Sequence, residues 1–216
     1  MADEWVIGPR PAIDRKLWLP LARVVTAALL AVLGPVKVRG AYRVPREGGV
    51  LILSNHLSDV DPIILQHACP RAPHYMAKSE LFDVPVLGTL MRVFGSFPVK
   101  RGEPDRQALK HSAELLKADE AVVIFPEGQL SETGELQELK AGVALIARLS
   151  AGVPVICVGI DGSQRIIPYG KLIPRPSFKT ITVEWGEPRV FEKGTDAQEI
   201  LYWISGQLRM FGNYPE

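Results

Sequence analysis

The sequence has only two cysteines, Cys69 and Cys157, among 216 residues. They lie far apart and form no CxxC pair, which argues against a disulfide framework and a cysteine-based zinc site, and a reducing compartment is expected. Net charge is also small, because 25 Lys and Arg offset 24 Asp and Glu. General polyanion binders carry a strong basic excess, so we expect no nucleic-acid partner.

A long uninterrupted apolar run is missing as well. The most apolar segment, residues 17–38, contains Pro20 and Arg23 and reaches a helix stop at Gly34-Pro35. With Pro20 in the first turn, about 15 residues stay helical and span ~22 Å. A bilayer core is ~30 Å thick, so this segment is too short to cross a membrane.

Basic and aromatic residues flank this segment. They are Trp5, Arg10, Arg15, Lys16, Trp18, Lys37 and Arg39. This mixture is typical of a helix that lies in the lipid headgroup layer, although a buried helix with basic flanks is the alternative. We therefore expect a membrane-surface segment at residues 1–37 and one domain at residues 38–216. The expected location is the cytoplasmic face of a membrane, as a peripheral or monotopic protein.

Apolar residues, by contrast, are plentiful: 47% of the chain is hydrophobic and 23% is charged, as in a folded globular protein. Short apolar runs predict buried strands at residues 50–54, 121–125 and 154–160, and the alternating run 179–185 predicts an edge or half-exposed strand. Helical periodicity appears at residues 80–93, 104–117, 138–149 and 195–211. This order predicts an α/β fold in which helices flank a mixed sheet.

Two polar segments follow predicted strands, where reactive groups gather in open α/β sheets. In the first segment, SNHLSDVDP, His56 precedes Asp61 by five residues. That spacing cannot share one helical face, so we expect His56 in the loop and Asp61 at the start of the helix that Pro62 begins. From there a carboxylate can bind the Nδ1 proton of the ring and leave Nε2 as a general base.

Other interpretations of this pair stay open. Asp61 before Pro62 also suits a helix N-cap, with His56 only a structural group. A metal site through His56, Asp59 and Asp61 is a third possibility, although a closed site needs four ligands. The sequence has no GxSxG motif, so a nucleophile would come from the substrate as a hydroxyl.

The second segment is FPEGQLS, residues 125–131. Gly128 can adopt positive φ in the turn and expose backbone N–H groups. Such a turn can hold an anion or place Glu127 on a substrate hydroxyl, and a plain turn with a solvated glutamate is the alternative.

Four blocks together resemble the glycerolipid acyltransferases, the family of 1-acylglycerol-3-phosphate acyltransferase. NHLSDVD at residues 55–61 is similar to the NHxSxxD block of this family. GSFPVKRG at 95–102, FPEG at 125–128 and VPVI at 153–156 resemble its second, third and fourth blocks, in the same order. The resemblance covers residues from about 40 to 190.

The resemblance implies transfer of a fatty acyl group to the hydroxyl of a lysophospholipid, most simply 1-acylglycerol-3-phosphate to give phosphatidic acid. The co-substrate would be acyl-CoA or acyl carrier protein, without a further cofactor or metal, and the partners would be membrane lipid and the lysolipid. His56 would be the general base, and Asp61 would orient it. The residues implied in substrate binding are Asn55, Ser58, Lys100, Arg101, Glu127, Gly128 and Lys140, with Arg101 on the acceptor phosphate.

One departure from the family pattern concerns the acceptor. The third block normally continues EGTRS, whereas here Leu130 replaces the phosphate-binding arginine. Either Arg101 and Lys140 suffice for the phosphate, or the acceptor lacks one, as lyso-ornithine lipid does. A hydrolase with the same base and a lipid-binding protein without chemistry are the alternatives from other functional classes.

Overall fold

The computed structural model describes residues 15–100, 105–171 and 173–211, and within these ranges it contains one eight-stranded sheet. The strands are β1 (Val36–Arg39), β2 (Val50–Ser54), β3 (His74–Lys78), β4 (Phe97–Val99), β5 (Ala121–Ile124), β6 (Pro154–Asp161), β7 (Ile181–Trp185) and β8 (Arg189–Val190). The helices are α1 (Arg15–Leu33), α2 (Asp61–Ala68), α3 (Leu87–Val93), α4 (Arg106–Lys117), α5 (Gly142–Leu149) and α6 (Ala197–Phe211), with short 3₁₀ helices η1 (Ala41–Arg43), η2 (Ser79–Asp83) and η3 (Ser163–Arg165).

The sheet is mixed, as predicted, and its strand order is β1-β7-β6-β2-β5-β3-β4, with β8 beside β6. Strands β6, β2, β5, β3 and β4 run parallel to one another, whereas β7 and β8 run antiparallel to β6. The carboxyl ends of β2, β5 and β4 therefore share one edge of the sheet. The segments that carry the first three sequence blocks lie at this edge.

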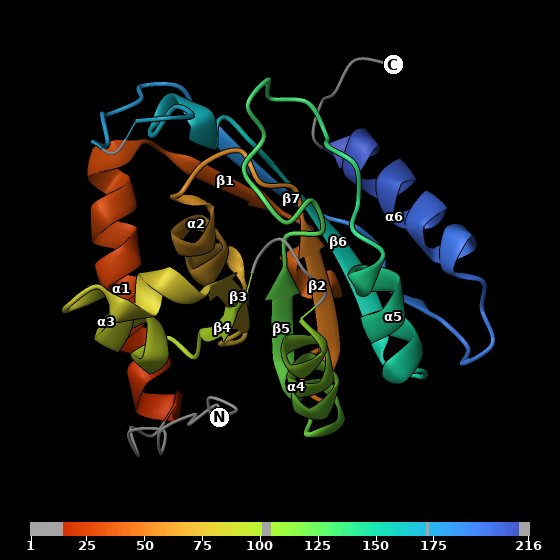
Figure 1. Ribbon diagram of the computed structural model, residues 1–216. Helices are drawn as coiled ribbons and strands as arrows, with labels where there is room; N and C mark the ends of the chain where they lie inside the picture. The colour runs from red at the N-terminus through yellow and green to blue at the C-terminus, as the bar shows by residue number, and fades with distance from the viewer. Residues whose placement is uncertain (1–14, 101–104, 172, 212–216) are drawn as a thin grey trace.

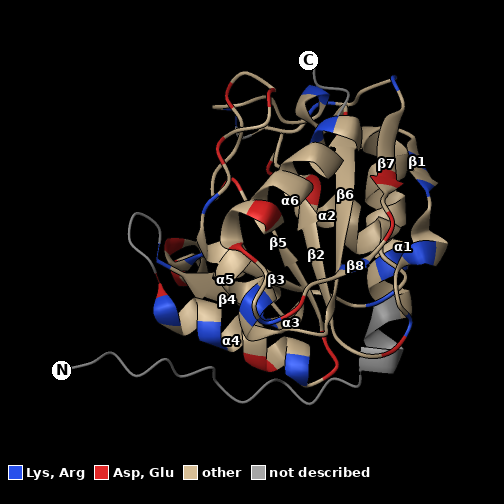
Figure 2. Ribbon diagram, turned by 90° about the vertical axis from the view of Figure 1, so that its right-hand side faces the viewer, with Lys and Arg blue, Asp and Glu red and all other residues tan. Residues whose placement is uncertain are grey.

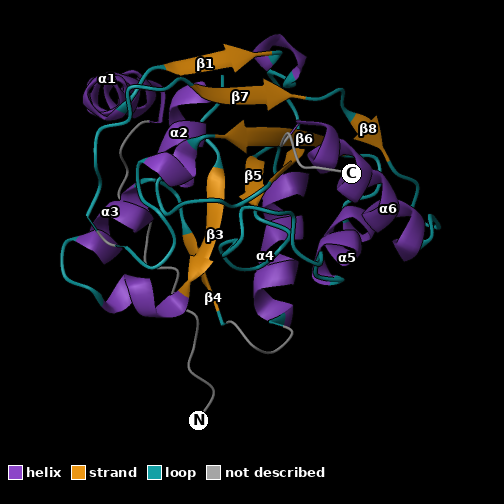
Figure 3. Ribbon diagram, turned by 90° about the horizontal axis from the view of Figure 1, so that it is seen from above, coloured by secondary structure: helices purple, strands orange, loops and turns teal. Residues whose placement is uncertain are grey.

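Helices cover both faces of the sheet: α1 and α2 pack on one, and α4, α5 and α6 pack on the other (Figures 1 and 3). In β2, Ile52 faces the first layer, where it joins Ile64 of α2, and Leu53 faces the second, where it joins Ile146 of α5. Because both faces are covered, β2 and β5 are apolar without alternation. Charged residues lie on the helices and loops around these two strands, as Figure 2 shows.

The predicted strands at residues 50–54, 121–125 and 154–160 correspond to β2, β5 and β6. The alternating run at 179–185 becomes β7, which is half-exposed, but β1 occupies the edge of the sheet beside it. Strands β1, β3, β4 and β8 were not predicted. They have two to five residues each and lack a long apolar run.

Two helices differ from the sequence prediction. Helix α1 begins at Arg15 and carries Pro20 inside it rather than in its first turn. The predicted helix at 80–93 is instead η2 followed by α3. Val84 between them is extended, as expected for a residue before proline, and Val86 has a φ of 68°. No helix in the described ranges is long and apolar enough to span a membrane.

The ends of two further helices also shift. Asp105 caps α4 by accepting hydrogen bonds from the N–H groups of Gln107 and Ala108, and Pro104, predicted in its first turn, lies outside the described residues. Helix α5 begins at Gly142, later than predicted. The residues before it form a loop, in which the N–H of Lys140 donates to the carbonyl of Pro126.

Candidate active site

His56 and Asp61 meet at the carboxyl end of β2. His56 lies in the loop after the strand, and Asp61 is the first residue of α2. The ring Nδ1 is 3.0 Å from Asp61 Oδ2, and the two residues are 7% and 0% exposed. The loop and helix start thus bring the pair together as the five-residue spacing predicted, although its catalytic role stays a prediction.

Asp61 orients the loop as well as the ring. The same Oδ2 atom accepts hydrogen bonds from the N–H groups of Leu57, at 2.7 Å, and Ser58, at 2.8 Å. Because a carboxylate oxygen only accepts hydrogen bonds, the ring nitrogen that faces it carries the proton. The favoured tautomer is therefore Nδ1–H, which leaves Nε2 unprotonated. The N-cap alternative is wrong, because the N-cap residue of α2 is Val60 and the Asp61 carboxylate binds N–H groups that precede the helix.

Phe125 fixes the plane of the His56 ring. Its ring stacks on His56 with a centroid distance of 3.9 Å and an interplanar angle of 16°. Phe125 directly follows β5, so the neighbouring strands β2 and β5 set the two rings face to face. Among the described residues, no hydrogen bond involves Nε2 of His56, which leaves this nitrogen for a substrate hydroxyl.

Glu127 connects the two polar segments from a buried position. Its Oε1 accepts from the backbone N–H of His56 at 2.9 Å, and its Oε2 accepts from the N–H of Gln137 at 2.8 Å. Burial raises the pKa of Glu127, and the two backbone hydrogen bonds oppose this rise. With 1% exposure, Glu127 is not a solvated glutamate. The geometry gives it a structural task, and its predicted contact with substrate stays a prediction.

Asn55 and Ser58 anchor the loop that carries His56 to the segment around β6. The Asn55 amide donates to the carbonyl of Ile160 at 2.9 Å and accepts from its N–H at 2.8 Å. Ser58 Oγ donates to the carbonyl of Ile167 at 2.8 Å. Both side chains are almost fully buried, and their hydrogen bonds support the loop. Their predicted contacts with substrate stay predictions.

The residues predicted for the acceptor side are more exposed. Gly128 has a φ of 73°, and a Cβ there would lie 3.4 Å from Cγ of Lys140, whose exposed side chain passes over the turn. Lys100 is exposed just beyond β4. Arg101 lies outside the described residues. Leu130 is half-buried three residues after Glu127.

Comparison with known proteins identifies the family. The family model named Acyltransferase matches residues 35–161, which is more than half of the chain. The chain belongs to the acyltransferase family. All four sequence blocks lie inside this match, and so do the His56–Asp61 pair and Glu127.

Named relatives agree with this result. This acyltransferase is 34% identical over 147 residues to the 1-acyl-sn-glycerol-3-phosphate acyltransferase of Bacillus subtilis, covering 67% of this chain and 73% of that enzyme. The chloroplastic enzyme BAT2 of Brassica napus, named for the same activity, is 36% identical over 120 residues, covering 55% of this chain but 34% of that protein.

A solved structure has the same fold. The crystal structure of the 1-acyl-sn-glycerophosphate acyltransferase PlsC of Thermotoga maritima matches this acyltransferase with a TM-score of 0.78 at 22% sequence identity. The match covers 91% of this chain and 79% of that chain. It confirms the predicted α/β fold with a mixed sheet flanked by helices.

Several contacts of this acyltransferase have no sequence signature. The N–H of Ser131 donates to the carbonyl of His56 at 2.8 Å, and Gln137 binds Glu127 through its backbone. Any residue type except proline can supply such a donor, so the motifs did not reveal them. The metal alternative finds no support: Asp59 is exposed, and no group of described residues is arranged to hold a metal ion.

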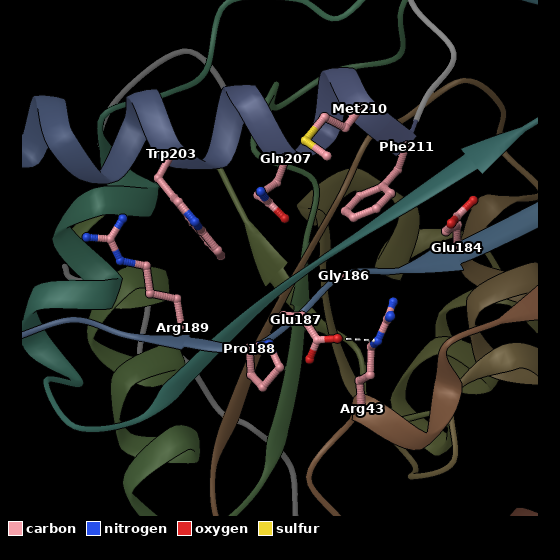
Figure 4. A pocket seen from close by; sticks show the side chains of 10 residues that line it. All are labelled: Arg43, Glu184, Gly186, Glu187, Pro188, Arg189, Trp203, Gln207, Met210 and Phe211. Atoms are coloured by element: carbon pink, nitrogen blue, oxygen red, sulfur yellow. Dashed lines mark ion pairs between the residues drawn. The ribbon is translucent and has the colours of Figure 1, made fainter.

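A cavity lies away from this site. It has a volume of about 460 Å³ between α6 and the end of β7, and Figure 4 shows Arg43, Arg189 and Trp203 in its wall. Its charges are compensated: Arg43 pairs with Glu187 at 2.7 Å, and Arg189 pairs with Glu199 at 2.7 Å. The lining includes no residue of the four sequence blocks.

Proposed function

We propose that this acyltransferase moves a fatty acyl group from acyl-CoA or acyl carrier protein to the free hydroxyl of 1-acylglycerol-3-phosphate, giving phosphatidic acid. The observation that carries the proposal is the His56 Nδ1–Asp61 Oδ2 contact, which leaves Nε2 without a protein partner among the described residues. The activities for which the Bacillus subtilis and Thermotoga maritima proteins are named support the choice of acceptor.

The proposed reaction needs one base and no protein nucleophile. Nε2 of His56 takes the proton of the acceptor hydroxyl while the oxygen attacks the thioester carbonyl. The tetrahedral intermediate collapses, the C–S bond breaks, and the thiolate recovers the proton from the imidazolium. Asp61 stabilises the imidazolium between these two steps, and the stacked Phe125 keeps the ring plane fixed.

The acceptor phosphate calls for cations beside this base. Lys100 follows β4, whose carboxyl end lies at the same edge of the sheet as that of β2. The next residue, Arg101, is the proposed phosphate ligand, because a guanidinium matches the paired oxygens of a phosphate. Lys140, beside the Gly128 turn, is the proposed second cation.

Helix α1 supports attachment to a membrane surface. Ala22, Leu30 and Leu33 pack toward the protein. On the other side, the exposed apolar residues are Leu21, Val24, Val25, Leu29 and Val32. An exposed apolar strip of this kind marks a membrane or protein contact. Because basic residues flank the helix, we favour a bilayer surface on the cytoplasmic side as the partner of this strip. Trp5 and Arg10 lie outside the described residues.

The proposal is tested with a panel of acceptors. The full chain is incubated with radiolabelled acyl-CoA or acyl carrier protein and with 1-acylglycerol-3-phosphate, lysophosphatidylcholine or lyso-ornithine lipid, and the His56→Ala variant is the control. Labelled phosphatidic acid is expected. Labelled ornithine lipid alone would assign a phosphate-free acceptor, in accord with Leu130. Free fatty acid formed at the same rate with every acceptor would identify a hydrolase.

A further inference from the structure

Residues 173–179, which we call the basic loop, expose large apolar side chains to solvent. Ile173 is 83% exposed and Phe178 is 96% exposed, the largest exposed fraction of any large apolar residue that the structure describes. Two prolines, Pro174 and Pro176, restrict the backbone between them. Single exposed apolar residues are ordinary. An almost fully exposed aromatic ring on a loop stiffened by two prolines instead indicates a binding surface.

The charge of the basic loop is positive and uncompensated. Arg175 and Lys179 are exposed, and neither forms an ion pair within the described part of the chain. The Nε of Arg175 donates only to a backbone carbonyl, that of Arg165, at 3.2 Å. No acidic residue occurs between positions 162 and 183. The loop therefore combines a protruding aromatic residue with cations that are free to bind anions.

The basic loop lies against the end of α1. The N–H of Ser177 donates to the carbonyl of Leu33, and the N–H of Ile181, just after the loop, donates to that of Pro35 at 2.8 Å. In Figure 1 the loop is the blue segment at the upper left, above the end of α1. The exposed apolar strip of α1 thus leads toward the basic loop.

The other side of the loop reaches toward the catalytic residues. The N–H of Arg175 donates to the carbonyl of Ile166 at 3.0 Å. The next residue, Ile167, accepts the hydrogen bond from Ser58 in the catalytic loop. The basic loop is therefore connected both to the helix proposed to lie on the membrane and to the segment that carries His56.

We propose that the basic loop is a second membrane contact, which prefers bilayers with anionic headgroups. Phe178 and Ile173 enter the interface, where aromatic side chains are stable, while Arg175 and Lys179 bind lipid phosphates. This rests on the membrane attachment in the proposed function and adds the class of lipid. Charge complementarity selects an anionic bilayer, because the loop offers only cations around its apolar residues.

Vesicle flotation of the full chain tests this proposal. Vesicles of phosphatidylcholine alone are compared with vesicles that also contain phosphatidylglycerol. Near an anionic surface each basic residue is worth about fivefold in affinity. The double variant Arg175→Gln/Lys179→Gln should therefore bind the anionic vesicles about 30-fold more weakly and the neutral vesicles unchanged. Phe178→Ser should weaken binding to both kinds about tenfold, because it loses buried apolar area.

Matched controls use exposed residues on the α5–α6 side. The pair Arg148→Gln/Lys193→Gln removes the same charge, and Tyr202→Ser removes an aromatic residue that is 85% exposed on α6. Both controls should bind vesicles like the unmodified chain. Loop variants that bind like these controls would overturn the proposal, as would a chain that binds neither kind of vesicle.

A second measurement separates this proposal from the proposed function. In detergent micelles, which offer no anionic bilayer, the loop variants should transfer acyl groups at the unmodified rate. The unmodified chain could fail to transfer acyl groups to any acceptor while the loop variants still lose vesicle binding. That result would refute the proposed function and support the membrane contact. Normal acyl transfer with unchanged vesicle binding in the loop variants would refute the contact alone.

Discussion

The loop after β2 that carries His56 and the lysines proposed to bind the acceptor lie at the same end of the sheet, but the structure holds them differently. Asn55, Ser58 and Asp61 are almost fully buried, and each is hydrogen-bonded to backbone groups. Lys100 and Lys140 are exposed, and no described carboxylate pairs with either side chain.

This difference separates reaction from recognition. The proposed general base needs a fixed ring, and the buried contacts hold the His56 ring in place. An anionic headgroup needs only nearby charge, which exposed side chains supply without fixed geometry. Leu130 belongs to the proposed acceptor side, so its departure from the family pattern concerns the acceptor rather than the His56–Asp61 pair.

The largest expected effect is at the base. His56→Ala should lower kcat by about 10²–10⁴-fold, because it removes proton transfer from the acceptor hydroxyl. The variant should keep its fold, as measured by its Tm. His67→Ala on α2 is the matched control and should leave kcat unchanged. Near-normal turnover in His56→Ala would falsify the base assignment.

Substitutions of Asp61 test what holds the His56 ring in place. Asp61→Asn can keep an oxygen at the Oδ2 position for Leu57 and Ser58, so we expect a nearly normal Tm. The kcat should fall by up to about 10⁴-fold, because a neutral amide stabilises the imidazolium less than a carboxylate does. Asp61→Ala should cost roughly 2–5 kcal/mol of stability, because both N–H groups lose their acceptor. If the two variants melted alike and kept full kcat, Asp61 would have no part in catalysis.

Substitution of Arg101 tests how the acceptor phosphate is bound. Arg101→Ala should raise the KM for a phosphate-bearing acceptor by about 10–100-fold, the value of a lost charge-assisted hydrogen bond. The KM for the acyl donor should change little. Initial rates with each substrate varied in turn measure both constants, and equal increases would contradict the assignment.

Glu127 joins the two segments, and its effect should appear in stability. Glu127→Gln should cost roughly 1–2 kcal/mol, because an amide presents an N–H₂ group to a backbone donor. Burial raises the pKa of Glu127, so the folded chain binds more protons than the unfolded chain between the ordinary and raised values. The stability that Glu127 contributes therefore falls as pH rises through that window.

Urea unfolding at several pH values measures this effect. The difference in unfolding free energy between the unmodified chain and Glu127→Gln should shrink as pH rises from the ordinary pKa of Glu127 upward. A rise in the KM for the acceptor without any loss of stability would instead favour a direct contact between Glu127 and substrate.

The smallest effect is expected at Lys140. Lys140→Ala should raise the KM for 1-acylglycerol-3-phosphate by about two- to fivefold, because an exposed cation contributes at most about 1 kcal/mol. The increase should vanish at high salt, which screens exposed charges. A salt-independent increase would indicate that Lys140 acts through packing on the Gly128 turn.

The sequence predicted the parts of the fold that are encoded locally. The central strands were evident because β2 and β5 are buried on both faces and contain uninterrupted apolar runs. The short strands β1, β3 and β4 depend on pairing with distant neighbours, which no local pattern reveals.

The same distinction applies to the site. The spacing of His56 and Asp61 predicted their meeting, because a loop followed by a helix start allows few other arrangements. The stacking of Phe125 on His56 and the bridge from Glu127 to Gln137 were not predicted. They arise from the side-by-side placement of β2 and β5 and from backbone donors that any residue could provide.

A single oxygen atom, Oδ2 of Asp61, accepts from the imidazole and from two amides of the preceding loop. If Asp61 moves away from the ring, it must therefore also break its hydrogen bonds with the two backbone N–H groups. The orientation of the base is thereby as stiff as the backbone around it. Rates of hydrogen exchange at the N–H groups of Leu57 and Ser58 accordingly report how often the Asp61 carboxylate leaves this position.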